Sequence, residues 1–211
     1  MKRALVLFLI LGATAATQAE IIDRIAAIVD GRVITLSEVE RWSTLRLLSP
    51  REGDTTVDYQ RRTLDVMINM ILQRRDAERF GVQQVSDEAI QARIDSISAK
   101  YASKDEFQAR MRDVGLSEQE LHDAVRVRLQ LEAYVSERFA PLIFIPLEDI
   151  ERYYESSWSQ QRRAQGLDVP PLSEVREQIR EMLRAEQLQR EVDRWTEQLR
   201  NRANVDIYVY R

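Results

Sequence analysis

The sequence predicts a mostly α-helical protein with a small antiparallel β element, in which an N-terminal hairpin pairs with a C-terminal strand. Asp30-Gly31 lies between two β-branched runs, a strong hairpin signal because both central residues of the tight turn need positive φ. Ser and Thr helix-start signals recur through the middle of a chain that has only 6 Gly and 5 Pro. Residues 205–210 alternate between apolar and polar side chains. Because two strands alone are marginal in water, we expect the two chain ends to form one small sheet.

The first two helices follow the predicted hairpin directly. Residues 37–40, Ser-Glu-Val-Glu, form a predicted capping box that starts a helix ending before Pro50. Thr55 opens a longer helix, in which apolar residues recur at three- and four-residue spacing up to a closing Phe80-Gly81. These signals predict two consecutive helices that bury one face each.

Three more helices are predicted to start at Ser86, Ser103 and Ser117. The last two of these serines are followed at the third position by Glu106 and Glu120, which can complete capping boxes. The helix after Ser117 is apolar on more than one side, so we expect it to be the central and most buried helix.

The C-terminal third contains a predicted insertion. A short apolar extended piece covers residues 142–145, and Pro146 starts a helix. Residues 159–171, with one Gly and a Pro-Pro pair, are the best linker candidate. Ser173 begins a final long helix with an apolar strip along one face, and the predicted strand follows it.

The first nineteen residues have the pattern of a secretory signal peptide. Lys2 and Arg3 precede an apolar run of eight residues, and a small-x-small site ends at Ala19. The apolar run is too short for a membrane anchor, which needs roughly 20 residues. We therefore expect export, cleavage near Ala19 and a mature chain that does not span a membrane.

Composition excludes several classes of function. The chain has no Cys and one His, which excludes disulfide scaffolds, thiol catalysis and cysteine-based metal sites. It has 35 acidic against 31 basic residues, so nucleic acid is not an expected partner. His122 fits a solvated helix position, and the acidic residues near 149–155 fit a solvated helix face. The sequence thus predicts no catalytic residue, cofactor or metal.

Aromatic and thioether side chains are the candidate binding residues. They lie at helix positions with polar neighbours, where they could line a groove for apolar peptide segments. The alternative is ordinary packing in the core or between domains. The candidates for peptide binding are Trp42, Met67, Tyr153, Tyr154 and Trp158.

Three stretches of the chain resemble one protein family. Residues 21–39 resemble the opening hairpin and capped helix of SurA-type periplasmic chaperones. Residues 61–72, followed by Gly81-Val82 and by Val-Ser-Asp-Glu at 85–88, are similar to the family's next helix and the step after it. Residues 172–200 and the final strand resemble the family's C-terminal helix and closing strand.

The resemblance implies a chaperone core without the family's isomerase. Family members usually carry one or two parvulin domains of roughly 90 residues each, which cannot pack into the two dozen residues available here. The implied organisation is a signal peptide (1–19), an N-terminal chaperone region (20–145), a helix and linker replacing the parvulin domain (146–171), and a C-terminal helix and strand that complete the core (172–211).

The resemblance also implies a function. It predicts an ATP-independent periplasmic chaperone that binds unfolded outer-membrane or envelope polypeptides through apolar grooves. Two alternatives remain: a prolyl isomerase, which the missing parvulin sequence disfavours, and a dedicated structural subunit of an envelope assembly. Because the predicted sheet joins opposite chain ends, a strand-swapped homodimer is a further possibility.

Overall fold

The computed structural model describes residues 23–45, 51–81 and 83–210. The predicted signal peptide and its cleavage site near Ala19 lie outside the described residues. Within them, the strands and helices are β1 (Ile25–Val29), β2 (Arg32–Thr35), α1 (Leu36–Thr44), α2 (Thr56–Glu78), α3 (Asp87–Ser98), α4 (Lys104–Asp113), α5 (Glu118–Phe139), the 3-10 turn η1 (Ala140–Leu142), α6 (Leu147–Tyr153), the π-helical turn η2 (Tyr154–Trp158), α7 (Ser159–Ala164), α8 (Leu172–Arg202) and β3 (Val205–Ile207).

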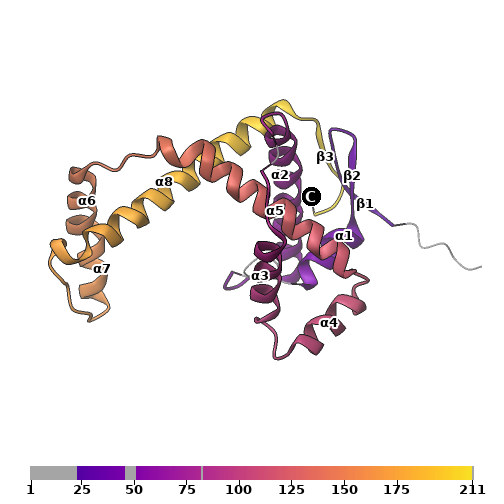
Figure 1. Cartoon of the computed structure of the whole chain (residues 1–211), viewed down its shortest axis with the longest axis horizontal. Helices are drawn as coiled ribbons and strands as arrows, with labels where there is room; N and C mark the ends of the chain where they lie inside the picture. Colours follow the sequence, from indigo (N-terminus) through magenta and orange to yellow (C-terminus); the bar gives the residue numbers. More distant parts are fainter. Residues whose placement is uncertain (1–22, 46–50, 82, 211) are drawn as a thin grey trace, which may run out of the picture.

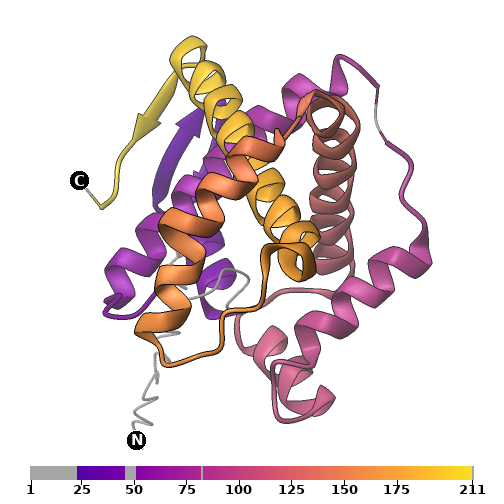
Figure 2. The ribbon, with the colours of Figure 1, turned by 90° about the vertical axis from the view of Figure 1, so that its left-hand side faces the viewer.

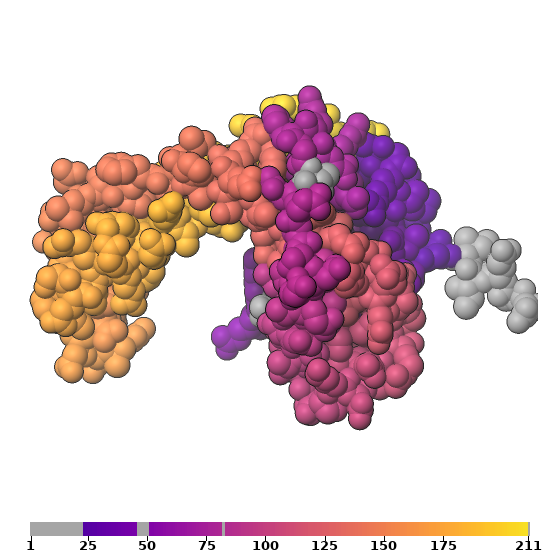
Figure 3. Space-filling model, viewed as in Figure 1, coloured from indigo at the N-terminus to yellow at the C-terminus, as the bar shows by residue number. Residues whose placement is uncertain are grey.

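The molecule has the shape of an arch. The sheet and α1–α4 form a body at one end, and α8 with the end of α5 forms an arm that carries α6 and α7 at its tip (Figure 1). The space-filling view shows an open hollow between this tip and the part of the body that contains α3 and α4 (Figure 3). Figure 2 shows that α6 and α7 run as one rod across the start of α8, against which α6 packs.

The sheet confirms the predicted pairing of the two chain ends. Its strand order is β2-β1-β3, and both pairs are antiparallel. Asp30 and Gly31 form the hairpin turn with φ of 47° and 87°, the positive values that a two-residue turn of this kind needs. The Asp30 backbone N–H donates to the Asn204 carbonyl at 2.8 Å, and the Asn204 N–H donates to the Asp30 carboxylate at 2.8 Å. One turn thus anchors the last strand to the first.

Helix starts follow the predicted caps with one correction. Thr55, Ser86, Ser103 and Ser117 are the N-caps of α2, α3, α4 and α5. The first helix, however, begins at Leu36 and has Thr35 rather than the predicted Ser37 as its N-cap, because Thr35 shares a capping box with Glu38. Ser37 instead donates its hydroxyl to Asp23, which precedes β1.

The helix that buries most side chains is α2 rather than the predicted α5. Among the described residues, α2 buries Thr63, Leu64, Met67, Ile68, Leu72 and Ala77. It packs against α1 and β1 and also against α5 and α8, so it is covered on several sides. The helix α5 has its own buried residues, but part of its apolar surface stays half-buried, including Val127 and Leu129.

The first half of the predicted linker is helical. Residues 159–164 form α7, and Ser159 is buried with its hydroxyl donating to the Tyr154 carbonyl at 2.6 Å. The helix continues because Ile150, Trp158, Val175 and Ile179 form a separate small core, which we call the tip core. Only residues 165–171 lack helix between α7 and α8.

The predicted bounds of the last helix and of the last strand also need correction. The final helix starts at Leu172, after Pro171, one residue before the predicted Ser173. The strand covers Val205–Ile207 rather than residues 205–210, because the chain turns away and Tyr210 has a φ of 57°. Val209 nevertheless stays buried in the core beside the sheet.

Candidate functional site

Two neighbouring cavities lie along the seam between α2 and α5. Their volumes are about 310 Å³ and about 410 Å³, and Arg74, Asp123 and Val127 line both of them. Because they share a wall, we treat them as one feature, the α2–α5 groove, with a first cavity beside β2 and α1 and a second cavity at the end of α2.

The first cavity has an apolar floor. Trp42 of α1 and Met67 of α2, two of the sequence-predicted residues, both line it. Trp42 is half-buried, whereas Met67 is 8% exposed, so Trp42 offers the larger contact surface. Met70 and Ile71, on the next turn of α2, are half-buried and continue the floor. The spacing of these residues on α2 follows from helical periodicity, which places positions three and four apart on one face.

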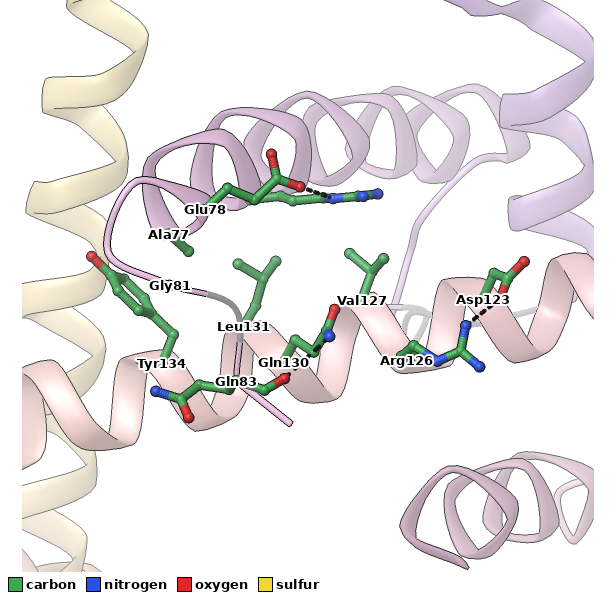
Figure 4. A pocket seen from close by; sticks show the side chains of 11 residues that line it. Ala77, Glu78, Gly81, Gln83, Asp123, Arg126, Val127, Gln130, Leu131 and Tyr134 are labelled. Carbon is green, nitrogen blue, oxygen red and sulfur yellow. Dashed lines mark hydrogen bonds and ion pairs between the residues drawn. The ribbon is translucent and has the colours of Figure 1, made fainter. Parts of the chain in front are cut away.

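The second cavity opens between the end of α2 and the middle of α5 (Figure 4). The side chains of Val127 and Leu131 point from α5 towards α2 in this view. Gly81, which follows α2, also lines this cavity and has a φ of 102°, a value that an L side chain rarely adopts. The Gln130 side-chain amide donates to the Gln83 carbonyl at 3.1 Å and ties the loop after α2 to α5.

Opposite charges balance around the groove. Its lining contains Arg32, Arg41, Arg74 and Arg126 together with Glu38, Glu78, Glu120 and Asp123. Arg74 pairs with Glu78 at 2.7 Å, and Arg126 pairs with Asp123 at 2.7 Å. Hydrogen bonds from Ser117 hold the pKa of Glu120 below its ordinary value, and Arg41 acts in the same direction. The groove therefore presents an apolar floor with a rim of no net charge.

Tyr134 closes one end of the second cavity. Burial raises the pKa of its hydroxyl, although Arg138 acts in the opposite direction. Arg138 donates to the Tyr134 hydroxyl at 2.6 Å and lies 4.5 Å from the centre of the Phe80 ring. The Tyr134 ring also lies 5.5 Å from that of Trp195 of α8. This end of the groove is thus part of the junction with the arm.

The other three predicted residues lie elsewhere. Tyr153, Tyr154 and Trp158 contribute to the tip core, at the opposite end of the arch from α1 and α2 (Figure 1). Trp158 is 7% exposed, and its ring stacks with that of Tyr154 at 5.6 Å. The Tyr154 hydroxyl donates to the Pro170 carbonyl at 2.9 Å. The structure therefore brings Trp42 and Met67 together and does not bring the three arm aromatics to them.

Sequence reasoning did not select most of the residues that line the groove, and three of them are apolar and half-buried or exposed. Val33 and Ile71 line the first cavity, and Val127 lines both cavities. Val127 belongs to the second apolar side of residues 118–139, which pointed to burial. A helix that is apolar on two sides can also form one wall of a groove, so this pattern was the available signal.

The described residues contain no group of three or more His, Asp or Glu side chains that could hold a metal ion. The ring of His122 lies beside Arg126, with Nδ1 3.2 Å from a guanidinium nitrogen. Among the residues that the structure describes, no helix is long and apolar enough to cross a membrane.

Comparison with known proteins gives a consistent set of relatives. No family model matches the chain. A protein of Saccharophagus degradans named Chaperone SurA is 27% identical over 156 residues, which are 71% of this chain and 36% of that protein. The protein of the same name from Pectobacterium atrosepticum is 30% identical over 143 residues, 64% of this chain and 32% of that protein. The one from Pseudomonas fluorescens is 26% identical over 168 residues, with coverages of 77% and 39%.

One solved structure shares the fold. It comes from work on PEB4 and Cj1289 of Campylobacter jejuni, described as two structurally related SurA-like chaperones. The match has a TM-score of 0.50 at 12% identity and covers 88% of this chain and 99% of that chain.

The fold is that of a helical protein of SurA-like architecture, closed by a sheet made from both chain ends. In sequence, the chain is similar to the proteins named Chaperone SurA, at 26–30% identity. The chain spans only about a third of the length of the curated relatives that it matches.

Proposed function

We propose that the chain is an ATP-independent periplasmic chaperone that binds unfolded outer-membrane or envelope proteins in the α2–α5 groove. The observation that carries this proposal is the combination of an apolar floor with a charge-balanced rim. Apolar contacts are non-directional, so such a floor accepts segments of differing sequence. Reversible contacts of this kind, summed over several client segments, need no nucleotide.

The groove is suited to partial rather than complete burial of a client. Trp42, Met70 and Val127 are half-buried in the chain alone, so each has surface left for a client side chain. Met70 adds an adaptable thioether, which can follow the shape of different partners. The rim pairs Arg74–Glu78 and Arg126–Asp123 are already satisfied, so a client does not need matching charges.

The tip of the arm is relevant to the proposed domain organisation. Residues 146–171 form α6, η2, α7 and a connecting loop, packed on the start of α8. We propose that this segment occupies the place of the family's parvulin domain, and that residues 20–145 and 172–211 form the chaperone core. The chain is then a chaperone without prolyl isomerase activity, and residues 1–19 direct its export.

Light scattering of an aggregating client tests the proposal. An outer-membrane barrel protein is diluted from urea with and without the mature chain. We expect suppression of aggregation near stoichiometric ratios. Met70→Gln places a polar group in the groove and is expected to weaken client binding about tenfold. Met182→Gln on α8 is the matched control, because Met182 is 42% exposed and lies outside the groove.

Three outcomes would contradict the proposal. No suppression at large excess would exclude the chaperone function, and equal effects of the two methionine variants would exclude the groove as the site. Acceleration of prolyl isomerisation in a proline peptide above the uncatalysed rate would favour the enzyme. Recovery of a single folded partner on pull-down, with no unfolded clients, would instead favour a structural subunit.

A further inference from the structure

The outer edge of β2 borders the α2–α5 groove. In the sheet order β2-β1-β3, β1 lies on one side of β2, and the described residues place no strand on the other. Arg32, Val33 and Ile34 of β2 all line the first cavity. Ile34 is buried and belongs to the core, whereas Val33 is 43% exposed. The groove therefore has an open strand edge as one of its walls.

The register of the hairpin defines which backbone groups face outward. Val29 and Arg32 flank the two-residue turn as a directly opposed pair, and Ile28 is opposite Val33. In such a hairpin the pair next to the turn exchanges hydrogen bonds and the following pair does not. The N–H and C=O of Val33 thus point away from β1. The next outward donor, the N–H of Thr35, already donates to the Glu38 carboxylate at 2.9 Å.

We propose that an extended segment of an unfolded polypeptide binds as a fourth strand along the outer edge of β2. Its backbone pairs with the N–H and C=O of Val33, and alternate side chains enter the first cavity towards Trp42 and Met70. An added strand lies about 4.8 Å from β2, and its side chains alternate between two faces, so one face can meet the cavity floor. This inference rests on the proposed function and specifies how the groove holds its client.

The charges around the first cavity indicate the chemistry of the segment. The lining includes the cations Arg32, Arg41 and Arg74 and the anions Glu38, Glu120 and Asp123. A strongly charged segment of either sign would meet like charges there, which is unfavourable at short range. The fitting occupant is an uncharged segment in which apolar and polar side chains alternate.

A second copy of the chain is a poorer occupant of this edge. β2 has four residues, and Val33 alone among them offers an outward donor that no side chain of the described residues uses. Pairing of two such edges gives few hydrogen bonds and little buried area, whereas stable interfaces bury about 800 Å² on each partner. A flexible client can instead combine this short pairing with side-chain contacts in the cavity.

Backbone N-methylation provides the direct test. The probe is an uncharged ten-residue peptide, blocked at both ends, in which Val or Tyr alternates with Thr. Two derivatives carry N-methyl groups either on all odd or on all even internal residues. They have the same composition and charge, but each blocks only one edge of the extended peptide. We expect one derivative to bind about tenfold more weakly than the other by fluorescence anisotropy.

A pair of chain variants places the effect at β2. Val33→Pro removes the outward N–H and leaves the bonds to β1 intact, because Val33 donates none of them; proline is tolerated at such edge positions. Val33→Thr keeps the N–H and the branched shape. We expect Val33→Thr to keep the roughly tenfold preference for one derivative over the other, and Val33→Pro to lose this preference and to bind the parent peptide about tenfold more weakly. If circular dichroism shows that Val33→Pro does not fold, the inference is tested by comparing the affinities of the two N-methylated derivatives for the unaltered chain.

The outcomes separate this inference from the proposed function. Equal affinities of the two derivatives would overturn strand addition, while binding of the parent peptide would leave the chaperone function intact. Suppression of aggregation without any binding of the parent peptide would also overturn strand addition alone. A dimer in analytical ultracentrifugation that Val33→Pro dissolves would assign the edge to a second copy and overturn the inference. Failure to suppress aggregation would overturn the proposed function itself.

Discussion

The sheet end of the molecule and the tip of the arm bury similar side chains but draw them from different stretches of the chain. The core at the sheet combines Ala26 and Ile34 with Ile68 and Val209, so its residues come from both ends of the sequence. The tip core combines Ile150, Trp158, Val175 and Ile179, all within one short segment. The first depends on closing a very long loop, whereas the second depends on local contacts.

This difference shows on which part of the chain the groove depends. The α2–α5 groove shares Ile34 and Met67 with the core at the sheet and shares no residue with the tip core. The arm joins the body near Trp195 of α8, whose indole N–H donates to Asp76 of α2 at 2.9 Å. Loss of the tip should therefore leave the groove in place, while loss of the sheet should not.

The largest effect is expected from Ile68→Ala. Ile68 is fully buried on α2 in the core at the sheet. Removing most of this side chain leaves a cavity and should lower the free energy of unfolding by about 2–5 kcal/mol. Urea unfolding followed by circular dichroism measures the loss. A change below about 1 kcal/mol would show that the sheet end does not limit the stability of the chain.

The matched change in the arm is Ile179→Ala. Ile179 is as completely buried, but it lies in the tip core. We expect hydrogen exchange to speed up in residues 147–183 while β1 and α2 keep their protection. Client binding in the groove should stay within about twofold of the unaltered chain. Equal loss of protection in β1 would instead show that the two cores unfold as one cooperative unit.

The smallest effect concerns the pH dependence of the two ion pairs that Glu132 of α5 makes. Arg93 of α3 donates to the Glu132 carboxylate of α5 at 2.8 and 3.1 Å, and Arg128 also pairs with it. Burial acts to raise the pKa of Glu132, but the two guanidinium groups outweigh it and hold this pKa below its ordinary value of 4.5.

Because the folded-state pKa is lowered, the pairs stabilise the fold above the unfolded-state pKa, and this stability is lost as the pH falls through the folded-state pKa. Glu132→Gln should therefore cost less than about 1 kcal/mol at pH 7, since the groups are partly exposed, and less still near pH 3. Thermal unfolding of both forms at the two pH values measures the difference. The same cost at both pH values would contradict an ionic origin.

Local signals in the sequence predict the fold well. The hairpin at Asp30-Gly31 and the caps at Thr55, Ser86 and Ser117 each depend on a few adjacent residues. The pairing of the last strand with β1 was predictable because a lone hairpin is marginally stable and needs a further strand, and residues 205–210 were the predicted strand. The error at Ser37 arose because two neighbouring residues, Thr35 and Ser37, can both cap a helix, and Glu38 selects Thr35.

The candidate site was only partly predictable. Trp42 and Met67 line the groove, but periodicity alone could not show that α5 faces them across a gap. The three arm aromatics have polar neighbours in sequence, which suggested an open surface. Their actual surroundings include Val175 and Ile179 of α8, far along the chain, and such long-range packing leaves no local signal.

The single helix α8 also constrains how the arm can change in length. Its 31 residues span about 46 Å at 1.5 Å per residue, and its two halves pack on different partners. An insertion of seven residues, close to two full turns, would lengthen the arm by about 10 Å while keeping both packed faces in phase. The segment of residues 140–146, which leads from α5 out to the tip, would need about three more extended residues to match. An insertion of two residues would rotate one face by about 200° and separate the tip from its partners. Reach along this arm is therefore expected to vary in steps of whole turns.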